Sequence, residues 1–199
     1  MAGWDKGGRA MEMTTMIKRY ALALLMIWSA GASAYTLSFN PTDQNVAQGD
    51  KAYVDVLIAG VLPGGLGSYD FDVLYDPTIL AFDSANDQFG LGFALGLGAF
   101  PDTGKVTLSD FSFELPGDLL SLQADSFLLL TLVFDTLSEG ASGLDFDAIT
   151  LGDVNGIPVN IAASDSGRVT VNPVPEAETW AMLLAGLGLV GVATRRRRG

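Results

Sequence analysis

Short stretches in which apolar and polar residues alternate recur through the middle of the chain. Residues 68–75 read SYDFDVLY, so an extended strand would place four apolar side chains on one face and mostly polar ones on the other. Comparable stretches follow about every ten residues, separated by turn residues such as glycine, proline and aspartate. This pattern predicts an all-β sandwich or barrel, without a helix of comparable strength. The predicted strands cover residues 35–39, 52–58, 68–75, 79–82, 105–113, 126–135, 144–151, 158–161 and 168–171.

Two stretches depart from simple alternation. Residues 127–134 read FLLLTLVF and are apolar on both faces, which predicts a central strand covered on each side. Residues 90–98 read GLGFALGLG, but they contain no Lys, Ser or Thr and do not run into a helix, so a phosphate-binding loop is not indicated. We interpret them as a flexible apolar loop, with a partner-facing patch as the alternative.

The middle of the chain is strongly acidic. Residues 35–174 contain 19 acidic and three basic residues, a net charge of −16. Such a surface repels nucleic acid, so we expect no nucleic-acid partner. The 199 residues include no cysteine and no histidine, which excludes disulfides, thiol catalysis and Ser-His-Asp arrangements. The middle segment is long enough to form one domain with a single core.

Residues 1–34 are expected to be an N-terminal extension followed by a secretory signal peptide. Lys18 and Arg19 precede an apolar run, which gives way to small residues that end in Ala32-Ser33-Ala34. Cleavage after Ala34 would make Tyr35 the first residue of the mature protein. A buried core helix is the alternative, but the run has no polar face. Translation from Met16 is a second expectation for this segment.

The abundant aspartates raise the alternative of a carbohydrate-active enzyme. A glycosidase holds two carboxylates across the bond that it cleaves. Asp70 and Asp72 lie two residues apart, as do Asp145 and Asp147. We interpret both pairs as solvated strand faces, and we expect no catalytic residues.

The sequence from Asp153 to Asn155 is similar to the start of a calcium-binding loop. Ile157 stands at the third ligand position and Ser164 at the twelfth, so the stretch is not an EF-hand loop. We expect no cofactor, although a structural calcium ion held by several loops stays an alternative. Its candidate ligands are Asp70, Asp72, Asp153 and Asn155.

Three stretches in the middle of the chain resemble cohesin modules, and more widely the sandwich superfamily that cohesins share with some carbohydrate-binding modules. They are Gly49-Asp50 before a strand, residues 67–82 with the turn Tyr75-Asp76-Pro77, and residues 153–159 followed by 167–171. The resemblance covers about 135 residues. It implies a jelly-roll β-sandwich of about nine strands over residues 35–172 and a role in recognition. Cohesins of cellulose-degrading assemblies bind dockerin modules through one sandwich face.

The carboxyl terminus has the composition of a short membrane helix. Residues 180–194, from Trp180 to Thr194, carry no charge. As a helix they would rise about 22 Å, and flanking arginines can snorkel to span the remainder of a hydrocarbon core of about 30 Å. A core helix with a basic tail is the alternative, but no face of the segment is charged. The residues expected to stop transfer and stay in the cytoplasm are Arg195, Arg196, Arg197 and Arg198.

Residues 173–199 as a whole resemble the PEP-CTERM sorting signal of Gram-negative bacteria. The motif residues Val174, Pro175, Glu176 and Ala177 are followed by the apolar segment and the arginines. In that family, a membrane enzyme called exosortase is thought to process the protein near the motif, and exopolysaccharide or biofilm production accompanies it. The resemblance implies exosortase as a partner and a transient intermediate in the inner membrane after export through the Sec pathway.

Together these observations predict a non-enzymatic exported protein of the cell surface or extracellular matrix that binds a polysaccharide or a protein. The alternatives are an enzyme that uses paired aspartates and a purely structural matrix protein.

Overall fold

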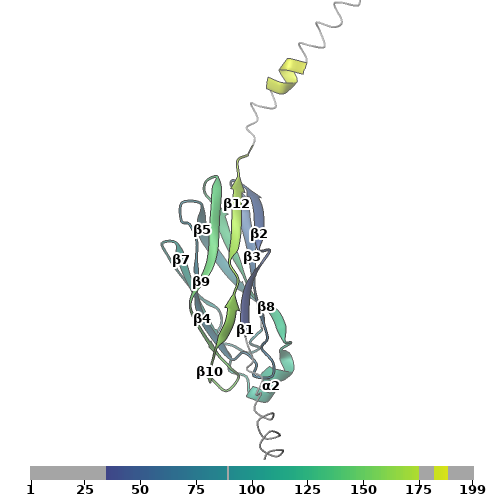
Figure 1. Cartoon of the computed structure of the whole chain (residues 1–199), viewed down its shortest axis with the longest axis vertical. Coiled ribbons are helices and arrows are strands. Elements are labelled where there is room, and N and C mark those ends of the chain that lie inside the picture. Colours follow the sequence, from purple (N-terminus) through teal and green to yellow (C-terminus); the bar gives the residue numbers. More distant parts are fainter. Residues whose placement is uncertain (1–34, 89, 175–181, 188–199) are drawn as a thin grey trace, which may run out of the picture. The chain divides into compact units, whose positions relative to one another are not determined.

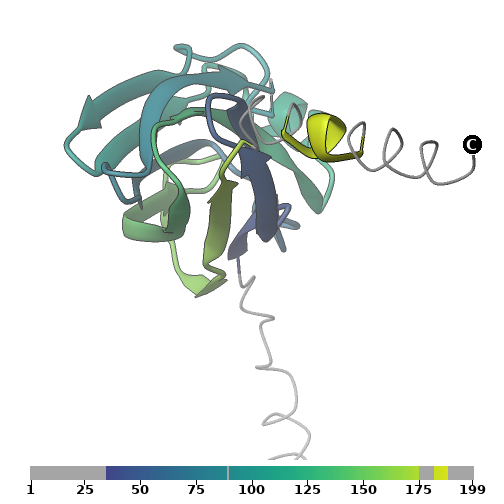
Figure 2. The same cartoon turned by 90° about the horizontal axis from the view of Figure 1, so that it is seen from above.

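The computed structural model of the chain describes residues 35–88, 90–174 and 182–187. Within them, two β-sheets pack face to face as a sandwich (Figure 1, Figure 2). Tyr35 opens the first strand, and its side chain is completely buried. The predicted signal peptide, including Ala32 and Ala34, lies outside the described residues.

The first sheet has five strands in the order β11-β1-β3-β8-β5. All its neighbouring strands are antiparallel except β1 and β11, which are parallel. The strands are β1 (Tyr35–Asn40), β3 (Lys51–Ala59), β5 (Leu80–Asp87), β8 (Ser126–Thr136) and β11 (Ile161–Ser164).

The second sheet has seven strands, six of them in the order β2-β12-β9-β4-β7-β6, and β10 pairs with β9. The chain's one described helix outside residues 182–187, α2 (Pro116–Leu122), lies at the end of the sandwich opposite the end of β12 (Figure 1). The strands are β2 (Asp43–Ala47), β4 (Ser68–Leu74), β6 (Gly98–Asp102), β7 (Lys105–Phe111), β9 (Gly140–Gly152), β10 (Pro158–Val159) and β12 (Gly167–Asn172).

The core fills the space between the two sheets with alternate side chains from each strand. In β3, the buried positions are every second residue, as the sequence pattern predicts. Phe39 of the first sheet stacks on Phe146 of the second with ring centroids 4.1 Å apart, and Phe71 meets Phe146 edge to face. Each fully buried apolar side chain contributes about 1.5–3 kcal/mol to folding.

The apolar stretch 127–134 forms β8, which lies between β3 and β5 as predicted. Its pairing with β3 slips by one residue at Leu129: Val56 pairs with Leu130 and Leu57 with Leu128, so Leu129 has no partner in the register. This bulge changes which residues face inward, so that both alternation phases of the stretch reach the core. On the outer face Val133 is also buried. The bulge and the burial of Val133 on the outer face together account for the apolar residues of both phases.

The strand count differs from the expected nine because of three features. β2 has no apolar alternation in its sequence and exists through parallel pairing with β12. β6 contains Pro101, which reads as a turn but is tolerated here because β6 is the edge strand of its sheet. The predicted strand 158–161 is two strands, β10 and β11, in different sheets.

The sequence gives no helix signal comparable to its strand signals, and the one described helix within the sandwich domain, at residues 116–122, is short. α2 is only seven residues long and begins with Pro116-Gly117, which indicates a turn when read as sequence. Proline is favoured in the first turn of a helix because its missing N–H would have no partner there.

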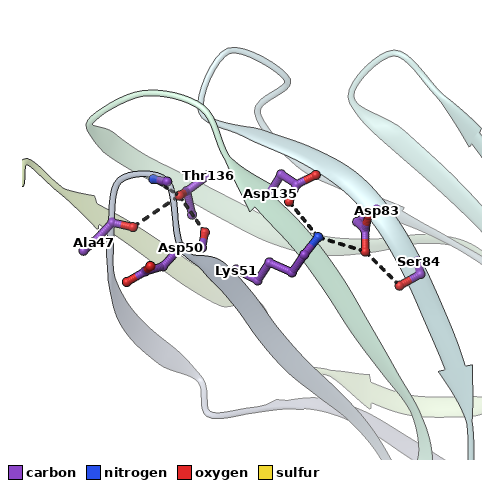
Figure 3. Close-up of polar contacts among 8 residues, drawn as sticks. Ala47, Asp50, Lys51, Asp83, Ser84, Asp135 and Thr136 are labelled. Carbon is purple, nitrogen blue, oxygen red and sulfur yellow. Dashed lines mark hydrogen bonds and ion pairs between the residues drawn. The ribbon is translucent and has the colours of Figure 1, made fainter.

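The turn between β2 and β3 is fixed to β8 by polar contacts. The Thr136 hydroxyl donates to the carbonyl oxygen of Asp50 at 2.7 Å and accepts the N–H of Gly49 at 2.8 Å. Next to it, the Lys51 ammonium lies 2.8 Å from Asp135 of β8 and 3.1 Å from Asp83 of β5 (Figure 3). These contacts link three neighbouring strands at one end of the first sheet.

Candidate functional site

Asp70 and Asp72 of β4, the candidate carboxylate pair and candidate calcium ligands, lie on the outer face of the seven-stranded sheet. Tyr69 and Phe71 point into the core and are buried, so the residues that alternate with them face outward. Cross-strand pairing places outward-facing Asp70 between Ser109 of β7 and Thr150 of β9. Asp70 is exposed, and its carboxylate has no hydrogen-bond partner among the described residues.

Asp72, two residues further along β4, is held by its neighbours. Its carboxylate accepts hydrogen bonds from the Thr107 hydroxyl at 2.5 Å and from the Lys105 ammonium at 2.9 Å. The Thr107 hydrogen bond first, and then Lys105, keep the pKa of Asp72 below its ordinary value. Asp147 lies opposite Asp72 on β9. Asp72 is therefore engaged in a hydrogen-bonded ion pair.

Asp70 and Asp72 do not both line the pocket on this face. Asp70 lines a pocket of about 310 Å³ on this face, whereas Asp72 does not. Asp110 is the other acidic residue at that pocket, but it follows the inward alternation of β7 and leaves the sheet on the opposite face from Asp70. Asp145 of the second pair accepts a hydrogen bond from Ser166. No pair of carboxylates faces across this pocket, as a glycosidase would require.

Beside the acidic residues lies a cluster of exposed apolar side chains, here called the aromatic patch. Large apolar side chains this exposed are unusual when they are contiguous, and such clusters mark interaction surfaces. The rings of Phe111 and Phe113 have centroids 4.5 Å apart, and those of Phe93 and Phe113 are 5.7 Å apart. The patch consists of Phe93 (71% exposed), Leu95 (65%), Phe100 (63%), Phe111 (41%) and Phe113 (52%).

The glycine-rich residues 90–98 position two of the five patch residues, Phe93 and Leu95. Residues 93–95 pair with the chain just after β7, because the Leu95 N–H donates to the Phe111 carbonyl and the Phe113 N–H to the Phe93 carbonyl. Ala94 forms a β-bridge with Ser112. Residues 93–95 are thus held by backbone pairing, extend the β6–β7 ladder and present Phe93 outward.

The buried carboxylate of Asp110 also holds the segment 90–98 in place. Asp110 is 4% exposed, and its Oδ1 accepts the N–H of Gly96 at 3.0 Å and that of Phe111 at 2.7 Å. Its Oδ2 and the hydroxyl of the paired Tyr69 are buried without a hydrogen-bond partner. Burial raises the pKa of the Asp110 carboxyl. Asp110 therefore helps to hold the segment that carries Phe93 and Leu95.

The candidate calcium ligands are used in protein contacts or lie apart. Asp153 Oδ1 accepts the N–H groups of Asn155 at 2.8 Å and Ile157 at 2.9 Å, which forms a local turn. Asp70 and Asp72 lie in β4, whereas Asp153 and Asn155 lie in the turn between β9 and β10. Within residues 35–88, 90–174 and 182–187 no group of three or more acidic residues is arranged to hold a metal ion.

The sequence points to two of the five residues of the aromatic patch. The apolar segment 90–98 contains Phe93 and Leu95, whereas Phe111 and Phe113 lie in the predicted strand 105–113. A signal was present: residues 105, 107 and 109 on the outward face of that strand are polar, and the next two outward residues are phenylalanines. The sequence around Phe100 does not indicate a strand, because the neighbouring Pro101 is typical of a turn.

The carboxyl-terminal region is described only in part. After β12 the chain is described without a gap as far as Val174. The next described residues, 182–187, are helical with exposed apolar side chains. No helix among the described residues has the length and apolar character needed to span a bilayer. Most of the predicted transmembrane segment lies outside the described residues, as do Pro175, Glu176, Ala177 and all four arginines. The membrane span and the roles of the motif residues therefore stay predictions.

The fold is that of a cohesin-like β-sandwich. The chain is similar to the seventh ScaB type I cohesin of Pseudobacteroides cellulosolvens, with 17% identity over 72% of this chain and 96% of that one, and a TM-score of 0.58. It is similar to CaCohA2 of Clostridium acetobutylicum, with 19% identity, 72% and 94% coverage and a TM-score of 0.55. A non-cellulosomal cohesin of the archaeon Archaeoglobus fulgidus matches at 16% identity, 75% and 97% coverage and a TM-score of 0.53.

Residues 173–198 match the PEP-CTERM protein-sorting motif. The chain thus combines a cohesin-like domain with a sorting motif that starts directly after β12. No curated protein has a matching sequence. Both resemblances inferred from the sequence, to cohesins and to PEP-CTERM signals, are confirmed at this level.

Proposed function

We propose that this protein is exported, sorted by an exosortase, and binds a partner protein at the cell surface or in the extracellular matrix. The sorting motif supports the first part and the cohesin-like fold the second. In this proposal the Sec pathway delivers the acidic domain across the inner membrane of a Gram-negative bacterium. Arg195 to Arg198 hold the tail in the cytoplasm, and the exosortase processes the chain near Val174-Pro175-Glu176-Ala177. The domain then works in a matrix that contains exopolysaccharide.

The aromatic patch is the observation that carries the binding role. Its phenylalanines are the kind of side chain that becomes the buried centre of a protein interface. A related fold supports this choice, since a type I cohesin of Clostridium thermocellum has been solved as a cohesin–dockerin complex and matches this chain with a TM-score of 0.58 at 10% identity. Self-association is disfavoured because each copy carries 16 net negative charges over residues 35–174. The partner is therefore a different protein with a neutral or basic contact surface.

The sorting step is tested by deleting the exosortase gene in the host and measuring the intact mass of the protein in membrane and surface fractions. We expect the full tail to be retained at the inner membrane in the deletion strain and a shortened protein at the surface in the parent strain. Equal masses in both strains would contradict processing.

The binding step is tested with the surface-exported protein carrying Phe93→Ser and Phe113→Ser. Cross-linking on intact cells, followed by quantitative mass spectrometry, identifies the proteins lost from the variant relative to the parent. The matched control carries Tyr53→Ser and Leu137→Ser, which remove two other large apolar side chains that are about half exposed. We expect loss of partners only in the patch variant, and an unchanged partner set would refute the role of the patch.

A further inference from the structure

The pocket next to the aromatic patch is lined by polar as well as apolar side chains. It has a volume of about 310 Å³ and opens on the outer face of the seven-stranded sheet. This volume lies at the lower limit of small-ligand sites and exceeds what one side chain needs. Its polar residues come from three strands that lie side by side, β9, β4 and β7.

Four side-chain groups at the pocket have no hydrogen-bond partner among the described residues. They are the carboxylate of Asp70 and the hydroxyls of Ser68, Ser109 and Thr150. The register holds them together, since Asp70 pairs with Ser109 on one side and with Thr150 on the other. A carboxylate only accepts hydrogen bonds at neutral pH, whereas each hydroxyl both donates and accepts. This set matches a ligand with several hydroxyl groups.

Two rings of the aromatic patch form apolar walls of the pocket. Phe100 and Phe111 both line it and both remain exposed. A pyranose ring has an apolar face of C–H groups and a rim of hydroxyls, so it can lie against an aromatic ring while its rim reaches polar side chains. The pocket offers both surfaces at once.

Gly98 keeps this space open. A Cβ atom at this position would lie 2.9 Å from the Phe100 ring and 3.2 Å from the Ser109 hydroxyl. A side chain here would push Phe100 aside and crowd the hydroxyl. Gly98 therefore sets the shape of the pocket between its aromatic wall and its polar floor.

The charge of the pocket restricts the sugar. No Lys or Arg among the described residues lines it, and Lys105, at the start of β7, is held by Asp72 at 2.9 Å. Asp70 and the net charge of −16 over residues 35–174 repel uronic acids and sulfated sugars. One carboxylate with three hydroxyls also suits a polyol better than a cationic side chain, which would use only acceptors.

We propose that this pocket binds one unit of a neutral polysaccharide. The pocket shares Phe100 and Phe111 with the aromatic patch, but the two roles can be separated. Sugar binding depends on Asp70, Ser109 and Phe100, whereas the test of the protein partner changes Phe93 and Phe113, which do not line the pocket. The protein would then hold a matrix polysaccharide and a surface protein on adjacent parts of one sheet face.

The test is isothermal titration calorimetry on the full chain, purified in a detergent without a sugar headgroup. The probes are cellohexaose and laminarihexaose as neutral oligosaccharides, hexagalacturonate as the charged one, and hexalysine as a cationic peptide. The pocket variants are Asp70→Asn, Phe100→Ala and Gly98→Ala. Asp43→Asn at the opposite edge of the sheet is the charge control, and Tyr53→Ala on the other sheet is the aromatic control.

We expect at least one neutral hexaose to bind and the galacturonate not to bind. Each pocket variant should weaken binding about tenfold, because each removes a charged hydrogen bond, a stacking ring or the space between them. Both controls should bind as the parent does. Phe93→Ser with Phe113→Ser should keep sugar binding, so a failure of the protein-binding proposal leaves this result intact.

Three results would overturn the inference. They are an absence of heat with both neutral hexaoses, pocket variants that bind as tightly as the controls, or binding of hexalysine or hexagalacturonate that depends on Asp70 and Phe100 while the neutral sugars fail.

Discussion

The hydroxyl of Thr136 satisfies two backbone groups in the β2–β3 turn, the N–H of Gly49 and the carbonyl of Asp50 (Figure 3). Thr136→Val keeps the shape of the side chain but leaves both groups without this partner. We predict that it lowers the free energy of unfolding by about 1–3 kcal/mol. Urea denaturation measures the loss. Thr170→Val is the control, because the Thr170 hydroxyl makes no hydrogen bond among the described residues, and an equal loss in both variants would contradict the prediction.

Asp72 gives the fold one component of its acid sensitivity. Its pKa is lowered from the ordinary 3.8 in the folded state, so its ionised form stabilises the fold at pH values above 3.8. That contribution is lost as the pH falls through the lowered folded-state pKa. We predict that the free energy of unfolding drops on acidification below about pH 4 and that Asp72→Asn reduces this drop. Urea denaturation at neutral and acidic pH measures it.

The control for this prediction is Asp70→Asn, which removes a carboxylate from the same strand that has no hydrogen-bond partner among the described residues. Asp76 and Asp83 also have lowered pKa values and add to the drop in every variant. Asp110 acts in the opposite sense, because its pKa is raised by burial. If Asp72→Asn and the parent lose the same stability on acidification, the assignment to Asp72 is wrong.

At the scale of elements, Gly67 fixes how the start of β4 meets the turn after β9. Its N–H donates to the Gly152 carbonyl at 2.8 Å, and a Cβ here would overlap the backbone carbonyl of Asp153. We predict that Gly67→Ala costs about 1–3 kcal/mol, because backbone rather than a flexible side chain must move. Gly117→Ala in α2 is the control, since a Cβ there meets nothing within 4 Å. Thermal unfolding should show a lower midpoint for Gly67→Ala alone.

The strands that were predicted correctly are those in which the order of apolar and polar residues reflects which side chains are buried. β3 and β4 alternate because one face of each packs on the core. In β8 the bulge brings both alternation phases to the core, and Val133 is buried on the outer face as well. β2 and β6 are edge strands with little core contact of their own, so their sequences record no alternation. Their existence depends on pairing with β12 and β7. A short helix such as α2 also lies below the length at which periodicity is informative.

At the scale of the whole molecule, charge is the dominant global property. Residues 35–174 carry 19 acidic side chains against three basic ones. Their mutual repulsion opposes the compact state and is screened by salt. We predict that raising NaCl from about 0.02 M to about 0.5 M raises the unfolding midpoint by roughly 2–4 °C, which corresponds to about 1 kcal/mol for a chain of this size. Calorimetric scans at several salt concentrations measure the shift.

The matched control replaces three exposed aspartates by lysine. They are Asp43, Asp118 and Asp165, whose carboxylates make no hydrogen bond or ion pair among the described residues. This variant should be less sensitive to salt than the parent. A midpoint that is independent of salt in the parent, or equally dependent in both proteins, would show that repulsion is not a significant cost.

The sequence by itself determined the class of fold, the acidic surface and the sorting motif. Each of these can be read without knowing which distant residues meet. The alternation lies in neighbouring residues, the charge follows from composition, and the motif spans 26 contiguous residues. Only the tertiary structure decided the candidate site, because Phe93, Phe100 and Phe111 come from separate segments and meet only when β6, β7 and the residues before them pair. The same holds for Asp70 and Thr150, which are 80 residues apart in the sequence but paired in the sheet. Strand register, which depends on pairing across the whole chain, sets which side chains share a face.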